Sequence, residues 1–465
     1  MKKGSLTVFL SLSLSIFISF SLFVTEIAIG NSQRIRFEAV VDLALNSVMG
    51  EYSVALKDRY GLLYLDTSYL EYPADISRVA DRFEVYFQAN TSKVYEQDHS
   101  PWGNLLLQQC EISSFQTAAA QGGLSMESQA IHYMEKHPEK SHEMAETKEA
   151  VDLFAGQKIS SDALEEFRSI MEQIDGMELP VMEKEDGTEE EVELGNPADW
   201  VYDLTGSDVL FLCEADLSGI STRQADIGNL ISHRGMRNTQ SADGDFHGNT
   251  DLFYAYLLTK LGNYGRIRDG SVLNAQLEYV LIGGSSDFEN MKSTVADIFS
   301  IRMVDNVGLA LEDGGLYEEA AGAADSLTAV QLCEAFRDPV IQSILYACAF
   351  LESVSDVNCL LNGGSVPLHK SGHTMSVSAV TEGSMYFHET EEGHSYSQYL
   401  IGMLSSMEEA RVLTRTMDIM EMDVRQMTGN SYFCMDQCLE RVGLFVSAQG
   451  GLGRNYETDR VYGYY

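Results

Sequence analysis

An uncharged apolar run near the amino terminus constrains this sequence more than any other feature. Residues Ser5 to Thr25 contain no acidic or basic side chain, and most of them are Leu, Val, Ile or Phe. As a helix the run is about 31 Å long, which matches the ~30 Å hydrocarbon thickness of a bilayer. Because Lys2 and Lys3 precede it, we expect a single-pass transmembrane helix in membrane lipid, with the N-terminus cytoplasmic and the bulk extracellular.

A cleavable signal peptide is the alternative reading of the same run. Ala28 and Gly30 are small residues spaced as at a cleavage site, so the chain would then be secreted after cleavage near Gly30. The run is longer than the usual signal core of ~7 to 15 residues, and Glu26 lies close to the cut. These two points favour a retained anchor.

Small polar residues recur along one side of the expected membrane helix. Their spacing of four places them on one face, and small side chains allow close approach of another helix. We therefore assign anchor and helix-packing roles to this stripe and to the acidic residue that closes the run. The residues are Thr7, Ser11, Ser15, Ser19 and Glu26.

The rest of the chain predicts an α+β fold in three parts. Residues 1–30 form the cytoplasmic tip and transmembrane anchor, and residues 31–60 a juxtamembrane amphipathic helix with apolar residues at helical spacing from Phe37 to Val48. Residues 61–465 form a large extracytoplasmic domain of mixed helices and strands, with an acidic insertion around 139–196.

Local patterns predict individual elements of that domain. Buried strands are expected at 62–65 and 209–213, a hairpin at 375–387 and a terminal strand pair from 444–446 and 461–465. Helices are expected at 162–175, from the Ser286 capping box, from Pro339 and over 397–427. The stretch 183–197 is predicted to be an exposed hairpin or loop, and Cys434 and Cys438 are the nearest pair for a disulfide.

Charge and motifs limit the possible functions. The net charge of -39 would repel phosphate backbones, which argues against nucleic acid as a partner. The sequence holds no Gly-x-Ser-x-Gly, Gly-x-x-x-x-Gly-Lys or His-Glu-x-x-His motif, so we expect neither an enzyme nor a cofactor. A weak calcium candidate has oxygen ligands at every second position around a glycine, but lacks the closing bidentate Glu. Its residues are Asp243, Asp245, Asn249 and Asp251.

Several stretches resemble known membrane-anchored proteins. Residues 2–10 (KKGSLTVFL), 37–52 (FEAVVDLALNSVMGEY) and 60–66 (YGLLYLD) resemble the start of TadE/TadG-like proteins. Together with 252–265, 276–307 and 396–427 they are similar to an uncharacterised clostridial-type family associated with Tad/Flp pilus genes. Pilins are cut after a Gly with a Glu five residues on, but here Gly4 is followed by Phe9 at that position, which departs from their pattern.

The resemblance implies a non-enzymatic structural or assembly component of a Tad/Flp-type pilus or related cell-surface apparatus. Its partners would be other pilus or secretion-apparatus subunits. Two alternatives from other classes stay open: a secreted or surface-anchored hydrolase with an unrecognised motif, and a calcium-dependent surface adhesin.

Overall fold

The computed structural model is an α+β fold made of two compact units. It describes residues 2–98, 104–155, 160–183, 189–213, 219–238, 249–390 and 392–464. Unit 1 comprises residues 1–129, 235–247 and 420–465, and unit 2 comprises 130–234 and 248–419. Helices α4 (Leu124–Glu135) and α18 (Glu409–Arg425) each contain residues of both units.

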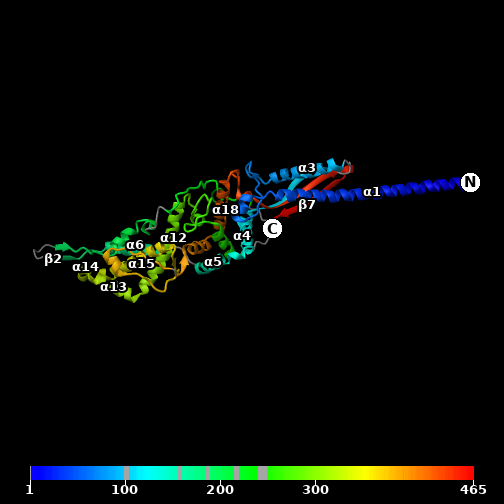
Figure 1. Ribbon diagram of the computed structural model, residues 1–465. Helices are drawn as coiled ribbons and strands as arrows, with labels where there is room; N and C mark the ends of the chain where they lie inside the picture. Colours follow the sequence, from blue (N-terminus) through cyan, green and yellow to red (C-terminus); the bar gives the residue numbers. More distant parts are fainter. Residues whose placement is uncertain are drawn as a thin grey trace. The chain divides into compact units, whose positions relative to one another are not determined.

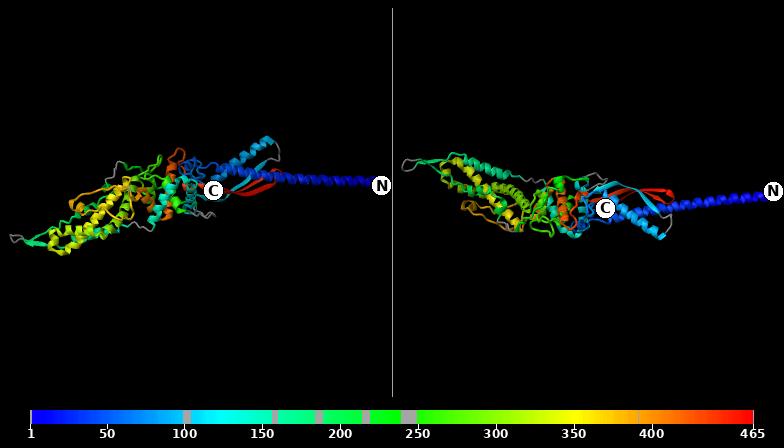
Figure 2. Two further views of the ribbon diagram at one scale, coloured as in Figure 1. Left: turned by 60° about the horizontal axis from the view of Figure 1, so that its bottom comes forward. Right: turned by 90° about the horizontal axis from the view of Figure 1, so that it is seen from above.

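Unit 1 is built on a long N-terminal helix and a three-stranded antiparallel sheet in the order β1-β6-β7. Cys110 of β1 pairs with Val446 of β6, and Val446 pairs with Thr458 of β7. Figures 1 and 2 show α3 and the strands alongside the inner half of α1. The elements are α1 (Lys2–Met49), α2 (Val54–Tyr60), α3 (Arg78–Asp98), β1 (Leu105–Thr117), β6 (Leu439–Gly450) and β7 (Asn455–Gly463).

The two ends of α1 have opposite surroundings. Its large apolar residues from Leu6 to Ile27 are all exposed. The turns from Phe37 to Val48 instead carry side chains that are buried in one core with α3 and β6. That core includes Phe37, Val41, Leu45 and Val48 of α1, Val79, Phe83 and Phe87 of α3, and Val442, Leu444 and Val446 of β6.

Unit 2 is mainly helical and packs around α12 and α15. Helix α15 is apolar enough to cross a membrane, but 94% of its most apolar stretch is buried, so it is the core helix of this unit. The helices are α5 (Ser141–Phe154), α6 (Asp162–Asp175), α7 (Asp199–Leu204), α8 (Val209–Leu212), α9 (Ile231–Arg234), α10 (Thr250–Lys260), α11 (Gln276–Ile282), α12 (Asp287–Glu312), α13 (Gly314–Asp325), α14 (Thr328–Leu332), α15 (Arg337–Leu361), α16 (Val377–Glu382) and α17 (Tyr396–Ser405). The strands are β2 (Val181–Glu183) with β3 (Glu189–Glu191), and β4 (Ser365–Val366) with β5 (His394–Ser395).

Several predicted elements are confirmed. Helix α6 has the predicted bounds and buries Ala163, Phe167 and Ile170. The Ser286 hydroxyl accepts a hydrogen bond from the backbone N–H of Glu289 and caps α12. Strands β6 and β7 form the terminal pair, and β2 with β3 form the acidic hairpin.

Other predicted elements are wrong. Residues 209–213 lie in helix α8 with Cys213 as its C-cap, and 62–65 form no strand but only isolated bridges at Leu65. Short apolar runs do not distinguish a buried strand from a helix turn. The predicted hairpin at 375–387 contains helix α16, because Gly383, at φ 71°, is a left-handed helix C-cap. The single helix at 397–427 is two, since α17 ends at Ser405 and α18 begins at Glu409.

Candidate functional site

The predicted anchor residues all lie on α1. Thr7, Ser11, Ser15 and Ser19 are exposed. The Ser11 hydroxyl donates to the carbonyl oxygen of Val8 at 3.0 Å, and that of Ser15 to Leu12 at 2.9 Å. The hydroxyls of Ser11 and Ser15 are therefore satisfied within the helix, and the stripe presents a surface that lipid or another helix can contact.

Glu26 marks the point where α1 meets the folded part of unit 1. Its carboxylate lies 2.8 Å from the guanidinium of Arg454, a residue of the turn between β6 and β7. One helical turn on, Gly30 is buried, and a Cβ there would clash with the same guanidinium. The Tyr456 hydroxyl donates to Gln33 at 3.0 Å. The sequence carried no signal that Arg454, 428 positions away, would be the partner of Glu26.

Several charged side chains of unit 2 form a buried cluster of ion pairs between α12 and α15. Arg302 of α12 and Asp356 of α15 are both inaccessible to solvent, and Arg302 Nε lies 3.0 Å from Asp356 Oδ2. Arg302 also pairs with Asp305 at 2.9 Å and donates to the carbonyl oxygen of Leu368 at 2.6 Å. Lys370 Nζ lies 2.6 Å from Asp356 Oδ1. We call Arg302, Asp305, Glu352, Asp356, Lys370 and His388 the buried ionic cluster.

The cations of the cluster keep its two most deeply buried carboxylates ionised. Burial alone would raise the pKa of Asp356, but the hydrogen bond from His388 and the charges of Arg302 and Lys370 lower it well below its ordinary value. The pKa of Glu352 is likewise lowered, by Lys370 against the effect of burial. Both carboxylates therefore stay ionised, and each depends on cations held inside the unit.

Glu352, Asp356 and His388 hold ligand atoms within 4.8 Å of one another, which is close enough for a metal ion. However, Lys370 Nζ lies 2.6 Å from both carboxylates, so an ammonium group already takes the position of a cation. This donor set does not fit an added metal.

A chain of contacts from Ser355 through His388 to Asp356 has the composition of a hydrolase triad. Ser355 Oγ is 2.7 Å from His388 Nδ1, and His388 Nε2 is 3.1 Å from Asp356 Oδ1. Ser355 is wholly buried, and its Oγ accepts the backbone N–H of His388 at 2.9 Å. A catalytic serine must be accessible to its substrate, and Ser355 is not. We therefore interpret these hydrogen bonds as contacts that hold the loop around His388 against α15.

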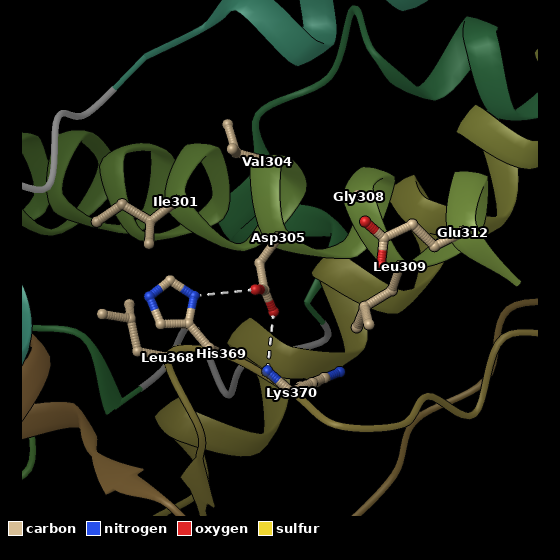
Figure 3. A pocket seen from close by; sticks show the side chains of 9 residues that line it. All are labelled: Ile301, Val304, Asp305, Gly308, Leu309, Glu312, Leu368, His369 and Lys370. Carbon is tan, nitrogen blue, oxygen red and sulfur yellow. Dashed lines mark hydrogen bonds and ion pairs between the residues drawn. The ribbon is translucent and has the colours of Figure 1, made fainter.

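A surface cleft of about 380 Å³ borders the cluster. Figure 3 shows Asp305 among the residues that line the cleft, in contact with His369 and the backbone N–H of Lys370. Asp305 is also paired with Arg302 at 2.9 Å, so His369 and Arg302 share this carboxylate. Asp305 and Lys370 of the buried ionic cluster therefore line a cleft on the surface, whereas Asp356 stays buried.

A second group in unit 1 combines Glu421, Cys434 and Asp436. Arg425 lies 2.5 Å from Glu421 Oε1 and 3.3 Å from Cys434 Sγ, so a guanidinium occupies this group. Cys434 and Cys438, the nearest pair for a disulfide in the sequence, are both free thiols, and Cys438 Sγ donates to the carbonyl oxygen of Cys434 at 3.3 Å. Burial raises the pKa of the Cys438 thiol well above its ordinary value.

The calcium candidate remains a prediction. Asp243 and Asp245 lie outside the described residues. Asn249 is the exposed N-cap of α10, and Asp251 is in the first turn of that helix.

Glu278 of α11 is a buried carboxyl outside the ionic cluster. One oxygen, Oε1, accepts hydrogen bonds from the Tyr264 backbone at 2.8 Å and the Tyr396 hydroxyl at 2.9 Å. The other, Oε2, has no hydrogen-bond partner. Burial raises the pKa of Glu278 to about 7, against the effect of those hydrogen bonds. The group therefore changes charge near neutral pH inside the fold.

This pKa predicts that unit 2 is less stable above neutrality. The folded pKa exceeds the ordinary 4.5, so the contribution of Glu278 is fully present below pH 4.5 and is lost as the pH rises through about 7. In the parent chain, the ionisation of Glu278 should raise the unfolding constant by at most about tenfold per pH unit. Glu278→Gln should remove this pH dependence. Thermal unfolding between pH 5 and 8 measures it, and an unchanged pH dependence in the variant contradicts the assignment.

Comparison with known proteins places most of the chain in one group. Residues 187–450 match a protein family described as a family of unknown function, DUF5702. No curated protein and no solved structure matches the chain.

Proposed function

We propose that this chain, which belongs to a family of unknown function (DUF5702), is a non-enzymatic, membrane-anchored structural or assembly component of a Tad/Flp-type pilus or related cell-surface apparatus. The family match begins at residue 187 and assigns no activity. The support therefore comes from the residues of the chain itself, above all from α1.

The exposed apolar surface of α1 is the observation that carries the proposal. From Leu6 to Ile27 the large apolar residues have exposed fractions between 44% and 68%. Water does not favour a contiguous apolar surface of this size, whereas lipid does. Twenty residues, 6–25, rise about 30 Å as a helix, which is the thickness of the hydrocarbon core.

The continuity of α1 supports a structural role. The helix runs from Lys2 to Met49 without interruption, so the anchor and part of the core of unit 1 are one rigid element. A flexible tether would be enough to keep an enzyme at a membrane. A rigid connection instead fixes the direction of the attached unit, which an assembling subunit needs.

The surroundings of Gly30 support the retained anchor over the alternative of a secreted form. That residue is helical and buried beside Arg454, and the carbonyl oxygen of Gly30 accepts from the Tyr456 hydroxyl at 3.4 Å. Cleavage there would remove a segment of α1 that is bound to β7. The resemblance of residues 2–10 to TadE/TadG-like proteins adds the pilus context, and Lys2 and Lys3 before the apolar run support the orientation with the N-terminus inside.

Cross-linking from the membrane helix tests the assembly role. Ser15→Cys lies on the predicted packing face, and Ser13→Cys is a matched control, because two positions on a helix are about 200° apart. Oxidation in native membranes should cross-link the Ser15→Cys chain to a neighbouring subunit at several times the yield of the control. Equal yields, or none at either position, would argue against helix packing in an assembly.

A further inference from the structure

Unit 1 contains a surface cavity of about 470 Å³ just beyond the C-terminal end of α1. It is lined by side chains within 51–55 and 66–71, by Arg82 of α3 and by Asn430. All of these residues belong to unit 1. The volume is within the range of about 300 to 1,000 Å³ that small-ligand sites have, so the cavity has room for a bound group.

Asp66 places a buried carboxylate in the wall of this cavity, where it is only 5% exposed. Its Oδ1 accepts a hydrogen bond from the backbone N–H of Ser68 at 2.9 Å, and its Oδ2 from the Ser68 hydroxyl at 2.7 Å. Two carboxylate oxygens can accept about four hydrogen bonds, so both have capacity left. Burial raises the pKa of Asp66, and only the hydrogen bonds from Ser68 oppose this effect. Within the described part of the chain, Asp66 thus lacks the cation with which buried carboxylates are usually paired.

The two basic side chains beside the cavity are bound to other groups. Arg82 Nε lies 3.0 and 2.8 Å from the two carboxylate oxygens of Glu51. Lys57 Nζ donates a hydrogen bond to the Tyr52 hydroxyl at 3.0 Å. A cation that pairs with Asp66 would therefore come from outside the residues that the structure describes.

The loop after Asp66 adds an aromatic and an apolar wall to the cavity. Tyr69 and Leu70 both have left-handed backbones, with φ 48° and 67°, which are strained for residues other than glycine. The N–H of Tyr69 donates to the carbonyl oxygen of Asp66 at 3.2 Å, and the N–H of Leu70 to the Ser68 hydroxyl at 3.2 Å. These bonds hold Tyr69 and Leu70 at the cavity, and the Tyr69 hydroxyl is inaccessible to solvent and has no hydrogen-bond partner.

The lining of the cavity fits an organic cation better than a metal ion. Calcium, for example, takes about 6 to 8 oxygen ligands, whereas Val54 and Leu70 offer none. An ammonium or guanidinium group on an alkyl stem uses every part of the lining. The carboxylate of Asp66 pairs with the charge, the ring of Tyr69 favours the cation, and the apolar side chains pack against the stem.

The surroundings of the cavity favour a cation that belongs to a protein. Val54 and Leu70 are 60% and 53% exposed, so they offer contact surface to a larger molecule that carries the cation. Residues 27–49 of α1 rise about 34 Å as a helix, which separates the cavity from lipid headgroups. This separation rests on the membrane anchor proposed above, whereas the chemistry of the cavity does not.

We propose that this cavity binds a lysine or arginine side chain of a partner protein, with Asp66 as its counter-ion. The bound cation supplies the charge that Asp66 lacks and donates to its remaining lone pairs. Glu71, which is exposed at the same cavity, adds to the attraction. A net charge of -39 likewise favours association with a basic partner.

Thermal unfolding of the full-length protein in detergent, at equal ionic strength, tests the proposal. The probes are N-acetyl-lysine methylamide and N-acetyl-arginine methylamide. At ten times its Kd, the better of the two should lower the unfolding constant about elevenfold. N-acetyl-norleucine methylamide has the apolar stem without the charge, and equal stabilisation by it would overturn the role of Asp66. Free n-butylammonium has the lysine side chain without the peptide groups, and equal stabilisation by it would overturn the assignment to a protein partner.

Two variants and a control locate the effect in the cavity. Asp66→Asn keeps an oxygen for the Ser68 backbone but removes the charge, so it should abolish the stabilisation by the cationic probes. Ala55→Leu narrows the cavity without changing any charge and should raise the Kd severalfold. Glu457→Gln removes an exposed carboxylate of β7 outside the cavity and should respond as the parent does. Stabilisation that persists in Asp66→Asn or is unchanged in Ala55→Leu, or none in the parent chain, would overturn the proposal.

Discussion

Replacing Asp356→Ala is expected to lower the free energy of unfolding of unit 2 by about 3 to 5 kcal/mol, because it removes one partner of a buried ion pair. Arg302, which is wholly buried, would keep Asp305 and the Leu368 carbonyl but lose the carboxylate 3.0 Å from its Nε. Lys370 would lose one of the two carboxylates that lie 2.6 Å from its Nζ. Chemical denaturation followed by circular dichroism measures the change.

An exposed ion pair provides the matched control for Asp356. Asp325, like Asp356, is hydrogen-bonded to an arginine: it accepts two hydrogen bonds from Arg337. Unlike Asp356, its side chain is 51% exposed. Asp325→Ala should therefore change the stability little, since water replaces the lost partner. If the two substitutions have equal effects, the buried ionic cluster does not stabilise unit 2 as described.

Two arginines in the centre of the apolar run are expected to release the chain from the membrane. The 13 Leu, Val, Ile and Phe residues of 5–25 favour insertion by about 4 to 8 kcal/mol in total, and each central Arg opposes it by about 2.5 to 3.5 kcal/mol. The double variant Leu12→Arg/Ile16→Arg therefore cancels most of the driving force. Alkaline extraction of membranes, followed by immunoblotting of pellet and supernatant, measures the distribution.

The control for release uses the same helix outside the span. Ile35 and Leu43 are 69% and 56% exposed on α1, beyond Glu26. Ile35→Arg/Leu43→Arg adds the same charge, but the chain should remain in the membrane pellet. An uncut parent chain found in the soluble fraction would contradict the anchor itself, and equal retention of both double variants would contradict its position.

Local signals in the sequence predicted the elements whose residues are contiguous. The apolar run, the Ser286 cap of α12 and the alternating apolar face of α6 each depend on neighbours within one helix. The prediction failed where one local pattern fits two structures. At 375–387, for example, Gly383 suits a hairpin turn as well as the left-handed end of a helix.

The buried ionic cluster could not be predicted from sequence spacing. Arg302 and Asp356 are 54 positions apart and meet only because α12 packs against α15. One signal was present: Arg302 and Asn306 follow Ile298 on the apolar face of α12, and charged residues interrupt the apolar run of α15. Polar residues on a core face indicate partners, although they do not name them.

The sheet of unit 1 has a consequence for biogenesis. The turns of α1 from Phe37 to Val48 need β6 to cover them, and β1 pairs with β6 more than 300 positions later in the chain, as Cys110 does with Val446. In the nascent polypeptide this face of α1 therefore stays uncovered for most of translation. All of unit 2 is synthesised before residues 439–463 can close that core. A truncated translation product would keep the apolar face of α1 exposed and would become a substrate for quality-control proteases.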